Sequence, residues 1–169
     1  MTRRSFPGVG LGVDVHRFGG GGPLVLGGVI VPHPEGLVGH SDADVLCHAV
    51  ADAVLGAAAL GDMGEHFPSD EERWRGASSL DLLRLVVGML APLGLEVGGV
   101  DATVIAEAPR LGPHRESMEA SLGEVLGLPR GACSVKVKSS DGLGLTGRQE
   151  GMAALAVATV RESSNPVAQ

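Results

Sequence analysis

The 169-residue sequence predicts a single domain of mixed α and β structure, in which helices pack against a sheet. Three observations support this prediction. Segments with alternating or helix-spaced apolar residues follow one another in the order ββαα-βα-βα. The chain has neither an internal repeat nor a linker-like stretch, and its length suits one hydrophobic core. We therefore expect residues 1–169 to form one domain, with 1–7 and 163–169 as flexible ends.

The first half of the chain is expected to supply two strands and then two helices. Val9–Phe18 is typical of a strand that leads into the Gly19–Gly22 turn, and Leu24–Val31 is predicted to complete a hairpin with it. Ser41 stands at a cap position, and the apolar spacing behind it predicts a helix over about 43–60.

A polar stretch separates the two predicted helices. Gly61–Ala77 is long for an ordinary connection, which indicates a functional or mobile loop. Ser78 then repeats the cap signature, and the apolar spacing that follows predicts a second helix, which Pro92 and Gly94 end.

The second half is predicted to alternate strand and helix twice. Val100–Glu107 and Cys133–Lys138 are typical of strands, the latter with strict alternation of apolar and polar residues. Pro113–Leu126 is predicted to be a helix that Gly127 stops. Arg148–Glu162 has apolar residues at helical spacing and is predicted to close the chain as an amphipathic helix.

The composition excludes several classes of partner. Asp and Glu number 20 against 13 Lys and Arg, a formal charge of -7, whereas nucleic acids and anionic membranes bind basic surfaces. Three Phe and one Trp are too few aromatic residues for stacking on single strands. No segment is apolar enough to span a membrane, and no secretory signal is recognisable. We expect a cytoplasmic protein with no nucleic-acid and no membrane partner.

Asp14 and His16 are the first candidate metal ligands. Alternate residues of a strand project from one face, so the carboxylate and the imidazole would converge, and Zn²⁺ accepts both ligand types. On the following predicted helix, Asp44, His48 and Asp52 stand four residues apart on one face, and His48 is a candidate third ligand. The alternative interpretation is an ordinary polar surface at a turn and on an amphipathic helix.

Three further segments carry groups suited to anionic or flat ligands. His40 and Ser41 precede the predicted helix, where free backbone N–H groups favour an anion, although capping alone also explains Ser41. Lys136–Arg148 combines both lysines of the chain with hydroxyls and glycines, either as a phosphate cradle or simply as turns. Ala106–His114 is a rigid turn that either presents backbone groups to a small flat ligand or only reverses the chain.

Four motifs together carry a resemblance to a known family. They are DVHRF, GHSDADVLCHAVADAVLGAAALGDMGEHFP, IAEAPRLGPH and LGLTGRQEGMA, in this order from about Gly8 to Val160. With them the chain resembles the 2-C-methyl-D-erythritol 2,4-cyclodiphosphate synthase family of the non-mevalonate isoprenoid pathway. The resemblance implies an α+β fold in which a mixed β-sheet is covered by helices on one face. It also implies a homotrimer with inter-subunit active sites.

The resemblance further implies the reaction of a cyclising phosphorus-oxygen lyase. The 2-phosphate of 4-diphosphocytidyl-2-C-methyl-D-erythritol 2-phosphate attacks the β-phosphorus, which gives 2-C-methyl-D-erythritol 2,4-cyclodiphosphate and CMP. A phosphate oxyanion is already a nucleophile near neutral pH. The reaction of this small-molecule cytidine diphosphate substrate therefore needs positioning and charge neutralisation, and no residue is assigned as a general base.

By the same resemblance, Asp14, His16 and His48 hold one divalent metal, Zn²⁺ with Mn²⁺ or Co²⁺ as alternatives. A second ion, Mg²⁺ or Mn²⁺, belongs on the substrate diphosphate. Asp141 is its candidate ligand and stands where the family usually has a Glu, so the carboxylate is one methylene shorter.

The resemblance assigns His40 and Ser139 to catalysis, with Ser139 in the place of a family Thr. The 106–112 turn resembles the cytosine pocket of the family, and Asp62–Gly64 and Phe67–Glu71 resemble its mobile methylerythritol loop. The residues assigned to substrate binding are Ser41, Asp62, Met63, Gly64, Phe67, Pro68, Ser69, Asp70, Glu71, Ala106, Glu107, Ala108, Pro109, Arg110, Leu111, Gly112, Lys138, Ser140, Leu145 and Arg148. Leu145 replaces a usual Phe.

The residues leave two other functions open. One is a metal-dependent phosphoester hydrolase that uses metal-bound water, and it would yield a hydrolysed diphosphate instead of a ring. The other is a non-catalytic trimeric protein that binds a nucleotide or an isoprenoid, in which four protein ligands close a structural metal site.

Overall fold

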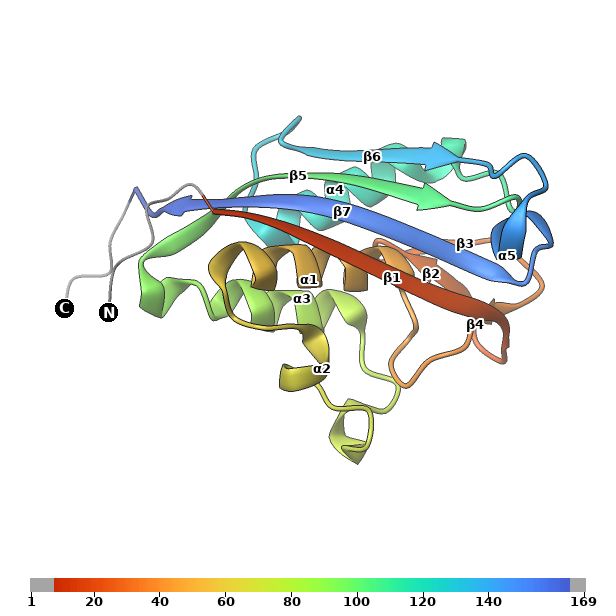
Figure 1. The fold of residues 1–169 in the computed structure, drawn as a ribbon, viewed down its shortest axis with the longest axis horizontal. Helices are drawn as coiled ribbons and strands as arrows, with labels where there is room; N and C mark the ends of the chain where they lie inside the picture. The colour runs from red at the N-terminus through yellow and green to blue at the C-terminus, as the bar shows by residue number, and fades with distance from the viewer. Residues whose placement is uncertain (1–7, 165–169) are drawn as a thin grey trace.

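A five-stranded mixed sheet forms one layer of the structure, a computed structural model that describes residues 8–164 (Figure 1). The strands are β1 (Gly8–Gly20), β2 (Leu24–Leu26), β3 (Val29–Val31), β4 (Gly36–Leu37), β5 (Leu95–Ile105), β6 (Cys133–Lys138) and β7 (Gly151–Glu162). The order across the sheet is β4-β1-β7-β5-β6, with β5 and β6 parallel and the other neighbours antiparallel. The short β2–β3 hairpin stands apart from this sheet.

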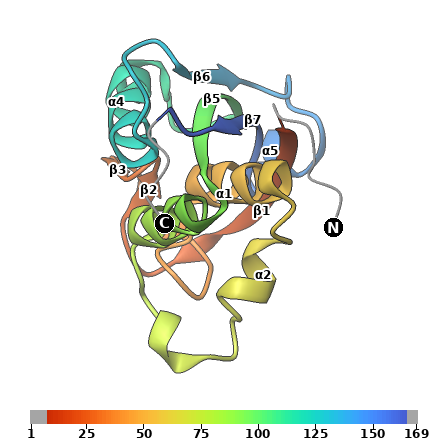
Figure 2. The ribbon, with the colours of Figure 1, turned by 90° about the vertical axis from the view of Figure 1, so that its left-hand side faces the viewer.

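The helices form the second layer. They are α1 (Val45–Ala58), α2 (Met63–His66), α3 (Ser79–Gly88), α4 (Arg115–Leu126) and α5 (Gly144–Gly147), with the 3-10 helices η1 (Glu72–Trp74), η2 (Ala91–Leu93) and η3 (Gly112–His114). The three long helices α1, α3 and α4 lie on one side of the sheet (Figures 1 and 2). This arrangement confirms the predicted α+β class with a mixed sheet. Within residues 8–164, no helix is both long and apolar enough to cross a membrane.

The core lies between the sheet and α1, which is buried nearly all around. Only His48, Asp52 and Gly56 of this helix are not buried, and they stand four residues apart along one line. Asp44 is not part of that line, because it is the fully buried N-cap residue of α1. The observed polar face of α1 is therefore narrower than the one that the sequence predicts. The predicted cap at Ser41 is wrong.

Two glycines of β1 allow α1 to pack directly on the strand. A Cβ atom at Gly10 would lie 2.1 Å from the Ala53 carbonyl oxygen, and one at Gly12 would lie 1.9 Å from that of Ala49. No side chain larger than a hydrogen fits at such an approach. The close contact brings His48 of α1 over Asp14 and His16, the next β1 residues that face the helix.

The predicted N-terminal hairpin is wrong. Leu24–Val31 is split into β2 and β3 by Gly27 and Gly28, which adopt φ values of 57° and 74°. β1 pairs instead with β4 and, over ten consecutive residues, with β7. A long regular ladder satisfies more backbone groups than a short hairpin could.

The predicted C-terminal helix is also wrong, since Gly151–Glu162 is strand β7 between β1 and β5. Met152, Ala154, Ala156, Ala158 and Val160 are buried, and the residues between them point to the opposite face. Because these intervening residues are also mostly Ala, Leu and Val, both faces are apolar and the period of two is hidden.

The other predicted elements are present with shifted ends. The predicted helices over 43–60, 113–126 and after Ser78 correspond to α1, to η3 with α4, and to α3. The predicted strand over 133–138 is β6 with the same bounds, whereas β5 begins earlier than predicted, at Leu95. The polar loop Gly61–Ala77 contains α2 and η1. Of the predicted flexible ends 1–7 and 163–169, residues 1–7 and 165–169 lie outside the described residues.

Candidate metal centre and substrate pocket

The candidate metal ligands come from β1 and α1. Asp14 and His16 continue the row of alternate β1 residues that faces α1, directly after Gly10 and Gly12. The close packing of the two elements places His48 of α1 over this pair. The structure thus brings the three predicted ligands together, although 34 residues separate Asp14 from His48.

Three potential ligand atoms converge at this point. Asp14 Oδ2 lies 3.0 Å from His16 Nε2 and 3.0 Å from His48 Nδ1, and the two nitrogens lie 3.1 Å apart. Ligands at about 2.0–2.1 Å in a tetrahedral zinc site are about 3.3 Å from one another, so the triangle is close to the size that a divalent cation requires. These residues lie close enough to bind one metal ion, and an N₂O donor set is one that zinc accepts.

Hydrogen bonds on the outer sides of the two histidine rings leave the nitrogen atoms that face Asp14 free to bind a metal ion. His16 Nδ1 lies 2.8 Å from the Val38 carbonyl oxygen, which can only accept, so Nδ1 carries the proton and Nε2 offers its lone pair. His48 binds on its far side, through Nε2, to the hydroxyls of Ser41 at 3.1 Å and Ser79 at 2.9 Å.

Asp14 and His16 shift each other's pKa. Burial opposes ionisation of Asp14, but hydrogen bonds to His16 and His48 outweigh it and hold the pKa of this carboxyl well below its usual value. The hydrogen bond to Asp14 raises the pKa of His16 against the opposing effect of burial. The carboxylate is therefore ionised at neutral pH and attracts positive charge to this point.

A cavity of about 220 Å³ lies beside the three ligands. The predicted catalytic or substrate-binding residues that line it are His40, Ser41, Met63, Gly64, Phe67 and Ser69. Asp52, Trp74 and Leu82 line it as well. The spacing of Asp52 from His48 is a sequence signal for its place here, but no motif points to Trp74 or Leu82, which only the fold brings to the cavity.

Two polar contacts attach the loop after α1 to this cavity. Asp52 accepts the backbone N–H of Met63 at 2.8 Å, and His40 Nε2 donates to the Glu71 carbonyl oxygen at 3.0 Å. Burial raises the pKa of Asp52 against the effect of the Met63 N–H. Asp62, which caps α2 by accepting the Glu65 N–H, does not line the cavity. Neither do Pro68, Asp70 and Glu71.

The remaining predicted site residues form a second group at the end of β5 and β6. Glu107 Oε1 accepts the backbone N–H groups of Ser140 at 3.0 Å and Gly142 at 2.9 Å, and the Ser140 hydroxyl at 3.2 Å. These bonds join the 106–112 turn, with its cis Ala108–Pro109 peptide, to the loop after β6. The Ser139 hydroxyl donates to Asp141 at 3.3 Å.

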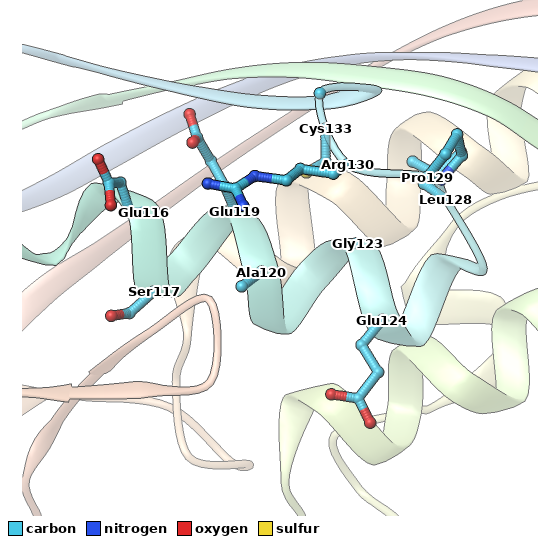
Figure 3. Close-up of a pocket in the computed structure, with 11 residues that line it drawn as sticks. Glu116, Ser117, Glu119, Ala120, Gly123, Glu124, Leu128, Pro129, Arg130 and Cys133 are labelled. Atoms are coloured by element: carbon cyan, nitrogen blue, oxygen red, sulfur yellow. The ribbon is translucent and has the colours of Figure 1, made fainter.

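The two groups are separate within one chain. None of the predicted residues 106–112, 138–141, 145 and 148 lines the cavity beside the candidate metal ligands in the described part of the chain. Arg148 pairs instead with Glu150 at 2.8 Å, on the exposed surface. A larger cavity of about 680 Å³ runs along α4 to the start of β6 (Figure 3). It is lined by Glu116, Glu119, Glu124 and Arg130 among others, and it holds none of the predicted site residues.

Comparisons with known proteins agree on one family. Residues 8–161 match the YgbB family. A 2-C-methyl-D-erythritol 2,4-cyclodiphosphate synthase of Salinibacter ruber is 52% identical over 155 residues, which are 92% of this chain and 99% of the relative. A synthase of the same name from Pseudomonas aeruginosa is 54% identical over 150 residues, 89% of this chain and 96% of the relative.

A solved structure supports the same relationship. The structure of a 2C-methyl-D-erythritol-2,4-cyclodiphosphate synthase in a CDP-bound form has a TM-score of 0.82 and 35% sequence identity to this chain. The match covers 90% of this chain and 99% of that one. The resemblance carried by the four sequence motifs is confirmed, and the chain belongs to the YgbB family, among the relatives named 2-C-methyl-D-erythritol 2,4-cyclodiphosphate synthase.

Proposed function

We propose that this chain converts 4-diphosphocytidyl-2-C-methyl-D-erythritol 2-phosphate into 2-C-methyl-D-erythritol 2,4-cyclodiphosphate and CMP, as a lyase of isoprene biosynthesis. The observation that carries the proposal is the convergence of Asp14, His16 and His48 beside a cavity, in a chain of this family. A phosphate oxygen of the substrate forms a bond to the β-phosphorus, and the bond from that phosphorus to the oxygen of CMP breaks.

Asp14, His16 and His48 would hold a divalent metal, Zn²⁺ or alternatively Mn²⁺ or Co²⁺, which supplies Lewis-acid polarisation of the β-phosphate when bound. His40 and Ser41 line the same cavity and contact the substrate phosphate and erythritol portion, with His40 stabilising the charge that develops. Intramolecular attack gains chiefly from such positioning, which contributes about 7–11 kcal/mol in favourable cases.

The second group of residues, at the end of β5 and β6, binds the nucleotide end of the substrate. The turn from Ala106 to Gly112 holds cytosine, while Lys138, Ser139 and Ser140 contact the diphosphate, with Ser139 in a catalytic role. Asp141 serves the Mg²⁺ or Mn²⁺ ion on the diphosphate. The bonds from Glu107 to the 140–142 loop support this assignment, because they make the turn and the loop one unit.

A homotrimer would join the two groups across subunits. Val9, Leu11, Val13 and Val15 are each at least half exposed, and they alternate with the β1 residues that face α1. With Leu155 and Val157 of the neighbouring β7, they form an exposed apolar patch on the sheet face without helices. Such patches mark protein interfaces, which supports an assembly through this face.

We also propose a cytoplasmic location, with the substrate and further copies of this chain as partners and with no nucleic-acid and no membrane partner. Cys47 and Cys133 are both free and buried, which suits a reducing compartment.

Phosphorus NMR of the products tests the proposed reaction. The purified protein with Mg²⁺ is expected to turn the substrate into one cyclic diphosphate and CMP, and His48→Ala is expected to lose both bound metal and turnover. Two free phosphate products without a cyclic species would instead establish the hydrolase alternative. Metal retained at full stoichiometry by His48→Ala would refute the ligand assignment.

A further inference from the structure

The far side of the His48 ring meets a second helix. Its Nε2 atom lies 2.9 Å from the hydroxyl of Ser79, the first residue of α3, which runs alongside α1 (Figures 1 and 2). Ser79 is only 1% exposed, so water does not compete for this hydroxyl. The contact therefore links a candidate metal ligand to an element that contributes none of the three ligands.

Asp42 in turn holds Ser79 by two hydrogen bonds. Its Oδ2 atom accepts the backbone N–H of Ser79 at 3.0 Å, and its Oδ1 atom accepts the Ser79 hydroxyl. The backbone N–H of Asp42 is itself bonded to the Ala77 carbonyl oxygen at 3.0 Å, which anchors the carboxylate at the start of α3. Ser78, the N-cap residue of α3, makes no side-chain cap bond, and the Asp42 carboxylate caps the helix in its place.

The hydrogen bonds from Asp42 through Ser79 to His48 determine which nitrogen of the His48 ring carries the proton. The Ser79 hydroxyl has a single proton, and the Asp42 carboxylate, which can only accept, receives it. Towards His48 the same hydroxyl must then act as acceptor, so Nε2 carries the ring proton. In the neutral ring the lone pair consequently lies on Nδ1, the atom that faces Asp14 and His16.

We propose that Asp42 and Ser79 are positioning residues of the metal centre. They fix the tautomer and the orientation of His48, so that Nδ1 is the ligand atom while His16 binds through Nε2. This inference rests on the metal site of the proposed function. Partners of this kind, behind a metal-binding histidine, change metal affinity by about 10- to 100-fold when they are removed. A purely structural role, capping of α3, would leave metal affinity unchanged.

Ser79→Ala separates the two roles, because it removes the hydroxyl and keeps the backbone N–H that Asp42 binds. The metal-free protein is titrated with Co²⁺, followed by visible absorption, and with Zn²⁺ against a chromophoric chelator, so that no turnover is needed. We expect about 10- to 100-fold weaker binding and an altered Co²⁺ spectrum. Ser78→Ala is the matched control and is expected to bind both metals as the wild type does.

A double-mutant cycle tests whether Asp42 acts through Ser79. Asp42→Ala alone is expected to weaken metal binding, whereas in the Ser79→Ala background it is expected to add no further loss. Unfolding of each metal-free variant in urea measures the capping contribution separately. Wild-type affinity in a folded Ser79→Ala variant would overturn this inference while leaving the proposed function standing. Failure of the wild-type protein to bind either metal would overturn the metal centre itself, and the inference with it.

Discussion

The carboxylate of Asp44 accepts the backbone N–H of Gly28 at 2.7 Å and so ties the β2–β3 turn to the start of α1. The same side chain accepts the N–H groups of Gly27, Leu46 and Cys47 at 2.9–3.1 Å. Asp44 is fully buried, so these four donors replace the water that the carboxylate has lost. Burial raises the pKa of this group, and the backbone N–H donors act in the opposite direction.

Asp44→Asn should remove the bond to Gly28 alone. The amide oxygen can keep the three bonds that Oδ1 accepts, whereas the amide NH₂ would face the Gly28 N–H, donor against donor. We expect the free energy of unfolding to fall by about 1–3 kcal/mol, measured in urea at one protein concentration. Asp62→Asn, at the exposed cap of the short helix α2, is the control and should cost clearly less. Equal losses in both variants would contradict the role of burial.

Gly12→Ala should disrupt both the packing of α1 on β1 and the candidate metal centre. The added Cβ would lie 1.9 Å from the Ala49 carbonyl oxygen and 2.7 Å from the Ala53 nitrogen, so α1 would have to move away from β1. We expect a loss of about 1–3 kcal/mol or more in the free energy of unfolding. Zn²⁺ affinity should also fall, because His48 moves with the helix.

Gly88→Ala is the matched control for this substitution. Gly88 is the last residue of α3, and nothing lies within 4 Å of an added Cβ. This variant is expected to keep wild-type metal affinity and to be as stable as the wild type or slightly more so. Unchanged metal affinity in Gly12→Ala would show that the glycine does not govern the approach of His48.

Leu11→Glu tests the proposed trimer. Leu11 is 65% exposed in the centre of the apolar row on β1, and a carboxylate there would lose its water on assembly. Sedimentation equilibrium is expected to show monomers in place of trimers, with turnover lost as well. Leu85→Glu is the control, since Leu85 lies on the helix side of the molecule and is 48% exposed. This variant should keep the mass of the wild-type assembly. A Leu11→Glu protein that stays trimeric would place the interface elsewhere.

Glu107→Gln should weaken the contact between the 106–112 turn and the 140–142 loop, which we assign to nucleotide binding. Hydrogen bonds from Gly142 and Ser140 hold the pKa of Glu107 below its ordinary value, so the carboxylate and its three bonds persist at neutral pH. The uncharged amide binds these donors less strongly. We expect KM for the cytidyl substrate to rise on the order of tenfold, with metal content unchanged. A wild-type KM would remove Glu107 from nucleotide binding.

Cys133 should react slowly with thiol reagents despite its place near the surface cavity of α4. Burial, together with the charge of Glu119, raises its pKa from 9.0 to about 11. At pH 8 this shift lowers the thiolate fraction roughly 100-fold. In a Cys47→Ala background, the native rate with an aromatic disulfide should therefore increase up to about pH 11, whereas in urea it should level off near 9. Identical pH profiles in both conditions would disprove the shift.

Local signals in the sequence predict many of the helices and strands and the residue types of the candidate site. The period of two in Cys133–Lys138 and the apolar spacing of α1 and α4 are local signals, so these elements were predictable. Asp14 and His16 share a face because they alternate on one strand, which is also a local property. The four motifs are specific enough to indicate the family and three candidate metal ligands.

The remaining features depend on contacts between residues that lie far apart in the sequence. Arg148–Glu162 has the alanine content of a helix, but Gly151–Glu162 becomes a strand because its backbone pairs with β1 and β5 on either side. Likewise, Gly12 brings His48 to Asp14 only when α1 packs on β1, and Ser79 meets His48 only when α3 lies beside α1. Sheet pairing and close packing join residues that lie far apart in sequence, and local propensity carries no information about such contacts.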